Sequence, residues 1–155
     1  MTYSETATRI LDSAERMARQ GGYNSCSFRE IATEIGIKSA SVHYHFANKE
    51  VLGAALAERY TNRFLEFLGE PTAEKPDDLL RRYAAGYRQG LLEDGQMCLC
   101  GMFGAEISDL PEPVARQTRA FFERNIQWLG QVFQAKGLKQ DDAEIEAACM
   151  IAALE

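Results

Sequence analysis

Polar and cationic side chains gather in the stretch SFREIATEIGIKSASVHYHF, residues 27–46, and just beyond it. If residues 39–46 form a helix with Val42 on its inner side, Phe46 also falls inside, and four residues face outward: Ala40, Ser41, His43 and Tyr44. Small side chains let a helix approach the edges of base pairs, and Ser, His and Tyr can exchange hydrogen bonds with bases or reach phosphates. Arg29 and Lys49, each near the start of a predicted helix, would attract phosphate there. The chemistry that this pattern favours is therefore contact with DNA.

Short helices are expected to position these side chains. Apolar residues at helical spacing predict a first helix over about residues 7–20, ended by Gly21 and Gly22. The capping box from Ser27 to Glu30 begins a second helix, which Gly36 ends. A third helix is predicted over residues 39–46, and Asn48 caps a fourth. Two short helices joined by Gly-Ile-Lys are typical of a helix-turn-helix, whose second helix enters the major groove.

The remainder of the chain also has helical periodicity. A helix is predicted after Pro76, followed by the glycine-containing stretch MCLCGMFGAEI, for which no helix is assigned. Pro111 and Pro113 open a long helix to about Lys136. A last helix begins at Asp141 or Asp142, and we expect the chain to end inside it. No alternating pattern indicates a strand, so the expected fold class is all-α.

Charge is distributed unevenly along the 155 residues, whose formal net charge is -6. Residues 1–64 carry eight Lys or Arg and seven Asp or Glu, whereas residues 65–155 carry nine and sixteen. An acidic chain is a poor candidate for broad, non-specific binding of nucleic acid, although a small local contact surface is compatible with it. The N-terminus lacks the layout of a signal peptide and no apolar run reaches 18 residues, which predicts a soluble cytoplasmic protein without membrane contact.

A family resemblance rests on FREIATEIGIKSASVHYHFANKEVL, which follows a helix ending in Gly-Gly-Tyr. Over about residues 8–56 the chain resembles the DNA-binding domain of TetR-family transcriptional regulators. His43 stands where many relatives have Tyr. The resemblance implies an all-helical homodimeric repressor with a variable C-terminal domain that binds a small molecule, and a dimer interface made by its last two helices. Carried over by position, it implies these DNA contacts: Ser27, Arg29, Lys38, Ser39, Ala40, Ser41, His43, Tyr44, His45 and Lys49.

The stretch CLCGMFGAEISDLPE, from Cys98, is similar to a segment of a TetR subgroup in which some members sense electrophiles or oxidants through the cysteine that matches Cys98. Here Met97 replaces a glycine and Cys100 adds a thiol. Inert buried thiols are the alternative for all four cysteines. The Cys98-x-Cys100 spacing does not fit a structural zinc site, and we predict no metal and no cofactor. The residues form no recognisable nucleophile-base pair or phosphate loop, so an enzyme is not expected.

Aromatic residues in the C-terminal part have two interpretations, the core of a helix bundle or the wall of a ligand pocket. Trp128 and Phe133 belong to this aromatic set as well. The residues predicted to line a pocket for an effector of unknown identity are Tyr83, Tyr87, Cys98, Met102, Phe103, Phe121 and Phe122.

The sequence therefore predicts an all-α protein with an N-terminal three-helix helix-turn-helix domain, residues 1–47, followed by a linker helix and a helical-bundle effector-binding and dimerisation domain, residues 48–155. Its predicted partners are a double-stranded DNA operator, a small-molecule effector and a second copy of the chain. Two alternatives remain open: a helical ligand-binding or interaction protein that does not read DNA, and a thiol-based sensor acting through Cys98.

Overall fold

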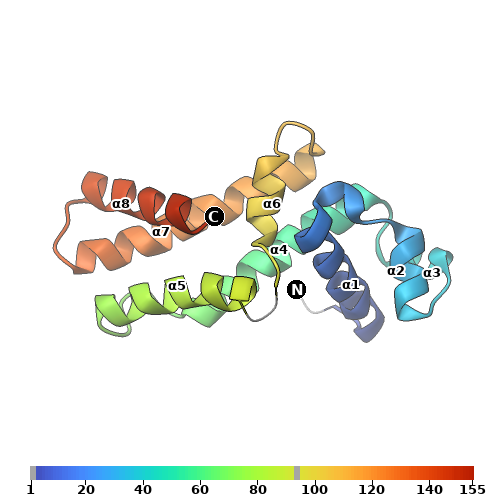
Figure 1. The fold of residues 1–155 in the computed structure, drawn as a ribbon, viewed down its shortest axis with the longest axis horizontal. Helices are drawn as coiled ribbons and strands as arrows, with labels where there is room; N and C mark the ends of the chain where they lie inside the picture. The colour runs from blue at the N-terminus through green and yellow to red at the C-terminus, as the bar shows by residue number, and fades with distance from the viewer. Residues whose placement is uncertain (1–2, 93–94) are drawn as a thin grey trace.

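The computed structural model describes residues 3–92 and 95–155, and within these ranges the chain is helical without strands. Figure 1 shows an elongated molecule with α1, α2 and α3 at one end, α5, α7 and α8 at the other, and α4 and α6 between them. The elements are α1 (Glu5–Gly21), the 3-10 turn η1 (Tyr23–Ser25), α2 (Phe28–Ile35), α3 (Ser39–His45), α4 (Lys49–Leu68), α5 (Pro76–Leu92), α6 (Leu99–Ala105), α7 (Glu112–Ala135) and α8 (Gln140–Leu154).

Local capping sets the boundaries of the helix-turn-helix, as the sequence predicts. The Ser27 hydroxyl accepts a hydrogen bond from the Glu30 backbone N–H at 3.1 Å and donates to the Glu30 carboxylate at 2.7 Å. Gly36 ends α2 with φ of 72°, a left-handed conformation that glycine adopts without steric cost. The Asn48 side chain accepts from the Val51 N–H at 2.9 Å and begins α4. These caps fix the turn between α2 and α3 and the short connection from α3 to α4.

Helix α6 is the main element that the periodicity of the sequence does not predict. The glycine-containing stretch folds into a helix over Leu99–Ala105, and the Cys98 sulfur accepts from the Gly101 N–H at 3.4 Å at its start. Leu99, Cys100 and Phe103 are its buried residues. Packing of these three side chains against neighbouring helices overrides the low helix propensity of the two glycines.

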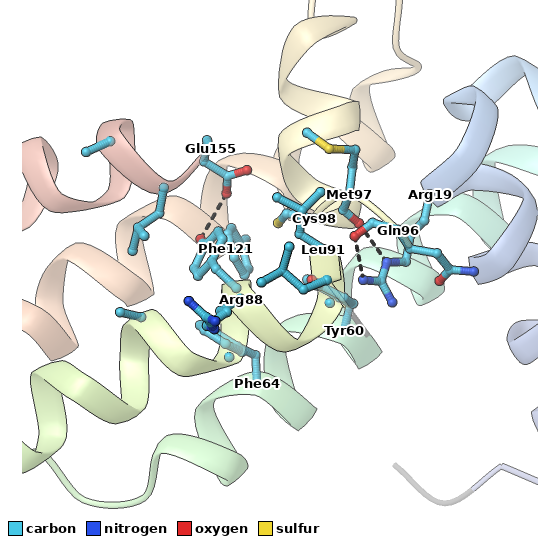
Figure 2. A pocket seen from close by; sticks show the side chains of 17 residues that line it. Arg19, Tyr60, Phe64, Arg88, Leu91, Gln96, Met97, Cys98, Phe121 and Glu155 are labelled. Carbon is cyan, nitrogen blue, oxygen red and sulfur yellow. Dashed lines mark hydrogen bonds between the residues drawn. The ribbon is translucent and has the colours of Figure 1, made fainter. Parts of the chain in front are cut away.

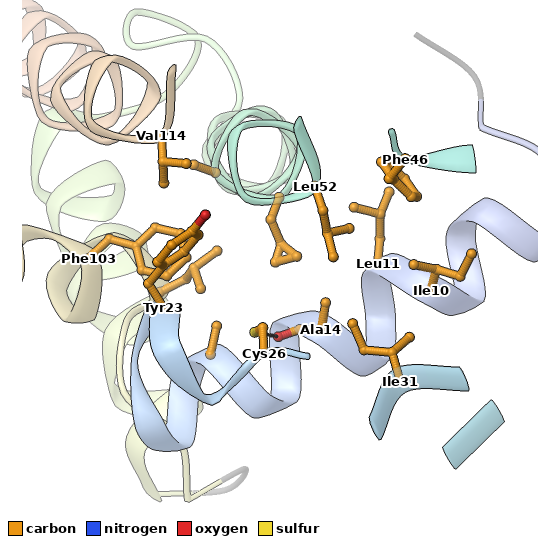
Figure 3. Packing of buried hydrophobic residues seen from close by; sticks show 14 of the residues in the cluster. Ile10, Leu11, Ala14, Tyr23, Cys26, Ile31, Phe46, Leu52, Phe103 and Val114 are labelled. Atoms are coloured by element: carbon orange, nitrogen blue, oxygen red, sulfur yellow. Dashed lines mark hydrogen bonds between the residues drawn. The ribbon is translucent and has the colours of Figure 1, made fainter. Parts of the chain in front are cut away.

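Two clusters of buried apolar residues form the core. The first joins α1, α2, α3 and α4 to α6 and α7, and Figure 3 shows Tyr23, Phe103 and Val114 closing it at one side while Ile10, Leu11, Ile31 and Phe46 surround its other side. The second lies between α4, α5, α7 and α8, with Tyr83 and Trp128 among its largest members. Because the first cluster includes residues of α6 and α7, the first four helices share a core with the C-terminal part.

None of the described helices combines the length and the apolar character that crossing a membrane requires.

Candidate nucleic-acid interface and effector cavity

The outward face of α3 consists of exposed residues, and its inward face is buried. Val42 is fully buried and Phe46 is 3% exposed, so these two side chains anchor the helix. Tyr44 is 86% exposed. The other residues that α3 and its preceding loop expose are Lys38, Ser39, Ala40 and His43, while Ser41 and His45 are partly exposed. The predicted inner and outer sides of this helix therefore agree with the observed burial.

Neighbouring rings orient the two largest side chains of this face. The His43 ring lies 4.6 Å from the Phe28 ring between centroids, and its Nδ1 is 3.4 Å from the Ala47 carbonyl oxygen. Tyr44 makes an edge-to-face contact with His45 at 5.1 Å. These contacts reduce the rotational freedom of His43 and Tyr44 before any partner binds.

The remaining candidates flank α3. Arg29 is exposed on α2, and Ser27 is partly exposed and occupied by its capping role. Lys49, the first residue of α4, is partly buried, and its ammonium lies 4.5 Å from the centroid of the Tyr23 ring. This cation–π contact places the Lys49 charge at the junction of α1, α4 and η1. Arg29 and Lys49 thus lie at the starts of two helices, where a phosphate could contact both the charge and free backbone amides.

Polar contacts of α1 hold α2 in place. Arg9 donates to the Ile35 carbonyl oxygen at 2.6 Å, at the end of α2. The Glu34 carboxylate accepts hydrogen bonds from Arg16 and Ser13, and these bonds lower the pKa of Glu34. The orientation of the helix-turn-helix therefore depends on α1 as well as on the shared core.

A cavity of about 320 Å³ lies between α1, α4, α5, α7, α8 and the segment that precedes α6. Figure 2 shows Arg19 and Glu155 at opposite ends of it, with Leu91 and Cys98 between them. The Tyr87 hydroxyl donates to Glu155 Oε1 at 2.9 Å, and burial of this carboxyl raises the pKa of Glu155. The other lining residues are Tyr60, Phe64, Ala84, Gly86, Tyr87, Arg88, Gly90, Leu92, Gln96, Met97, Phe121, Ala153 and Leu154. An apolar hollow of this size with a few polar groups is typical of a small-molecule site.

Three of the predicted pocket residues, Tyr87, Cys98 and Phe121, line this cavity. Tyr83 is fully buried beside it, where its hydroxyl donates to Asn125 Oδ1 at 2.9 Å. Phe103 packs edge-to-face on Tyr23 in the first core cluster. Met102 and Phe122 are not among the lining residues either.

The sequence did not predict several of the residues that line the cavity, above all Arg19, Tyr60 and Phe64. Tyr60 and Phe64 fit the apolar stripe of α4, so periodicity alone assigns them to the core. The sequence does contain one sign of close helix packing here: Gly86 and Gly90 are spaced by one turn of α5. A Cβ at Gly86 would lie 2.7 Å from Phe64, and one at Gly90 would lie 2.8 Å from Arg19. These glycines let α5 approach α4 and α1 closely.

The cysteines differ in their surroundings. Burial raises the pKa of Cys98 to about 12 and that of Cys26 to about 11, and it raises the pKa of Cys100 as well. Cys149 is exposed on α8. A thiolate is the reactive form of cysteine, so Cys98 in this conformation is protonated and a weak nucleophile.

Two short helices joined by a tight turn, the second with an exposed polar face and a buried inner face, have the arrangement of a helix-turn-helix. The sequence profile of the family described as "Bacterial regulatory proteins, tetR family" matches residues 10–56. The crystal structure of a TetR transcriptional regulator from Legionella pneumophila superimposes with a TM-score of 0.92 and 33% identity, covering 100% of this chain and 86% of that one. The chain belongs to the TetR family of transcriptional regulators, and its class is therefore a regulator and not an enzyme.

Two further relatives were found. The HTH-type transcriptional repressor DhaR of Mycobacterium sp. (strain GP1) is 24% identical over 132 residues, which are 83% of this chain and 64% of that protein. This chain thus spans less than two thirds of the length of DhaR. The structure of AibR in complex with isovaleryl coenzyme A and operator DNA has 22% identity and a TM-score of 0.73, and the match covers 97% of this chain and 84% of that one. The likeness to AibR concerns the fold.

Proposed function

We propose that this protein is a ligand-responsive transcriptional repressor that binds a palindromic operator as a homodimer. The observation that carries the proposal is the outward face of α3, with Tyr44 86% exposed, opposite an inner face that is anchored by Val42 and Phe46. Residues 1–47 form the DNA-binding domain in this proposal, and residues 48–155 bind the effector and dimerise. The proposal places the protein in the cytoplasm, because operator DNA lies there.

Repression is inferred from the relatives. DhaR is named a repressor, and the AibR complex contains operator DNA together with an acyl coenzyme A. In this chain the ten predicted DNA contacts share one end of the molecule, and none of them is buried. We assign base contacts to the residues of α3, chiefly His43 and Tyr44, and phosphate contacts to Arg29 and Lys49.

Dimerisation is inferred from α8, which is apolar on two opposite faces. Ala143, Ala147 and Ile151 are buried toward the second core cluster. On the opposite side lie Ile145, 62% exposed, and the exposed Cys149 and Ala152, at helical spacing. A second copy of α8 against this face would bury these side chains, and a two-fold axis there would present two copies of α3 to one duplex. Recognition helices about 34–36 Å apart contact successive major grooves.

Release by a ligand follows from the position of the cavity between the two ends of the molecule. A ligand that fits only a conformation with another spacing of the α3 helices draws the dimer away from the DNA-binding state. The change in operator affinity is then limited to the ligand's differential affinity for the two states.

The test is a fluorescence-anisotropy titration of a labelled duplex from the region upstream of the protein's own gene, at several salt concentrations. We expect tight, salt-sensitive binding that His43→Ala and Lys49→Ala both weaken, with the salt slope reduced by about one for Lys49→Ala. Gln134→Ala, an exposed change at the far end of α7, is the control and leaves the affinity unchanged. Binding that neither His43→Ala nor Lys49→Ala weakens would contradict the proposal.

A helical interaction protein that does not read DNA is the competing function. Its support is the weak positive charge of residues 1–64, with eight Lys or Arg and seven Asp or Glu. The same titration separates the two, since salt-dependent binding to any duplex would be absent for such a protein.

A further inference from the structure

Arg19 belongs both to the DNA-binding end of the molecule and to the cavity. It lies in the last turn of α1, two residues before the glycine that ends this helix. Its Nε donates to the Met97 carbonyl oxygen at 2.7 Å and its Nη2 donates to the Gln96 carbonyl oxygen at 3.3 Å. Gln96 and Met97 line the cavity and are followed by Cys98, the N-cap of α6 (Figure 2). One guanidinium therefore ties α1 to the segment that leads from the cavity into α6.

Among the described residues, the hydrogen-bond partners of Arg19 are two neutral carbonyl groups. Within residues 3–92 and 95–155, no carboxylate lies at ion-pair distance from its guanidinium, and its other contact is with the Tyr60 ring, 5.9 Å from the guanidinium carbon to the centroid. Guanidinium groups bind carboxylates through two parallel charge-assisted hydrogen bonds, which are stronger than bonds to carbonyl oxygens. A carboxylate in the cavity would thus be a better partner for Arg19 than the two carbonyl groups.

The acidic group of the cavity lies away from Arg19. Glu155 lies at the end of the cavity opposite to Arg19 in Figure 2, and its carboxylate accepts a hydrogen bond from the Tyr87 hydroxyl. Burial raises the pKa of Glu155. Arg88 also lines the cavity, so the charged groups among its described lining residues are two guanidinium groups and one carboxyl group. An anion is favoured at the Arg19 end.

Aromatic side chains surround the space between these ends. Phe64 makes an edge-to-face contact with Tyr87 at 5.7 Å and lies 6.1 Å from Phe121, and Tyr60 lies 5.9 Å from Phe121, all between centroids. Aromatic rings pack well against such walls in offset or edge-to-face geometry. At about 320 Å³ the cavity is near the lower limit of small-molecule sites. The size fits a ligand of one or two rings.

We propose that the effector is a small aromatic carboxylate, bound as its anion, and that Arg19 is its counterion and the residue that couples the cavity to the DNA-binding end. This rests on the proposed function. The carboxylate takes the donors that Arg19 gives to Met97 and Gln96, so the tie between α1 and the start of α6 is broken. Contacts at the far end of α6 are retained, because the Tyr23 N–H donates to Glu106 at 2.8 Å and Phe103 packs on Tyr23. The change that the carboxylate causes is therefore at the start of α6, next to the cavity.

The test uses the full chain and two matched pairs of probes, 3-phenylpropanoate with 3-phenylpropanamide and 2-naphthoate with 2-naphthamide. In titration calorimetry at pH 7.5, at least one of the two acids should bind at least tenfold more tightly than the matching amide. Arg19→Gln should abolish this preference and Arg19→Lys should retain part of it. Arg116→Gln removes an exposed arginine of α7 and is the control for net charge, and it should bind like wild type. Circular dichroism verifies that each variant is folded.

Equal binding of acid and amide, an unchanged preference in Arg19→Gln, or no binding of any probe at 10 mM would each overturn the proposal. Operator affinity is measured in parallel, without and with the acid. The acid should weaken operator binding at least fivefold in wild type and not in Arg19→Gln, and an acid that binds without this effect would overturn the coupling role. Absence of operator binding in the ligand-free protein would instead contradict the proposed function, while the calorimetry would still decide the ligand class.

Discussion

The side chains of His43 and Tyr44 are held by local contacts before any partner binds. His43 lies against Phe28 at 4.6 Å between ring centroids, and Tyr44 lies against His45 at 5.1 Å. Because these side chains are already oriented, they lose less conformational entropy when they bind DNA. Sequence alone placed both residues on the outer face, because Val42 and Phe46 fix which side is inward. It could not reveal the Phe28 contact, which depends on how α2 crosses α3.

The reactivity of Cys98 depends on its burial, which only the structure reveals. Burial raises the pKa of this thiol to about 12. We therefore expect iodoacetamide at pH 7.5 to alkylate Cys98 at least about a hundredfold more slowly in the folded protein than in urea, because little thiolate is present. Mass spectrometry of digested samples measures the rate at each cysteine.

The control is the same cysteine in the unfolded chain, whose thiol has its ordinary pKa. Rapid and selective alkylation of Cys98 in the folded protein would contradict this account and favour a thiol-based sensor.

Among the helices, α6 is the one that sequence periodicity fails to predict. Its seven residues include Gly101 and Gly104, and its three buried side chains contact helices that are distant in sequence. By contrast, both ends of α2 and the start of α4 are fixed by short-range caps at Ser27, Gly36 and Asn48, which the sequence displays. The cavity could not be predicted in full, because Arg19, Tyr60 and Leu91 come from three helices whose packing sets the space between them.

The contact between α1 and α2 should depend on pH through Glu34. Hydrogen bonds from Arg16 and Ser13 lower the pKa of Glu34, so the carboxylate stabilises the folded state above its unfolded pKa of about 4.3, and this contribution is lost as the pH falls through the lower folded pKa. At pH 7, Glu34→Gln should reduce the free energy of unfolding by about 0.5 kcal/mol, because the pair is largely exposed.

Urea unfolding of wild type and Glu34→Gln at pH 7 and at about pH 3 measures this difference. The two proteins should be equally stable at the lower pH, and Glu123→Gln, an exposed change on α7, should match wild type at pH 7. A difference that persists at the lower pH would show that the ionised Glu34 carboxylate is not its cause.

At the scale of the whole molecule, α5, α8 and the later part of α7, which belong to the acidic part of the chain, lie at the end opposite to α1, α2 and α3 (Figure 1). The carboxylates of these elements are therefore distant from the surface that we assign to DNA. The two ends are nevertheless linked through the first core cluster, through Arg19 with Met97, and through Tyr23 with Glu106. These links are the route by which, in our proposal, a ligand in the cavity alters the orientation of α2 and α3.

The outer face of α8 should carry the dimer contact. Ile145→Asp places a charge at a site that is 62% exposed in one chain and that we expect to be buried in the dimer. A buried unpaired charge is strongly unfavourable, so the variant should be monomeric and bind operator at least tenfold more weakly, with its helix content unchanged. Sedimentation velocity, anisotropy and circular dichroism measure these three properties.

The same charge introduced elsewhere is the control. Thr72→Asp, in the exposed segment between α4 and α5, should remain dimeric. If the Ile145→Asp protein is still dimeric, the outer face of α8 is not the dimer interface.

Photo-crosslinking from position 44 tests the central claim most directly, because it reports contact between the outward face of α3 and base pairs. A Tyr44→p-benzoylphenylalanine protein, irradiated with its operator, should crosslink at two positions about 34–36 Å apart along the duplex, one in each half-site. The same photoreactive residue in place of Gln134, at the far end of α7, should give no crosslink. Failure of position 44 to crosslink an operator that the protein demonstrably binds, or crosslinking from position 134 instead, would contradict the account.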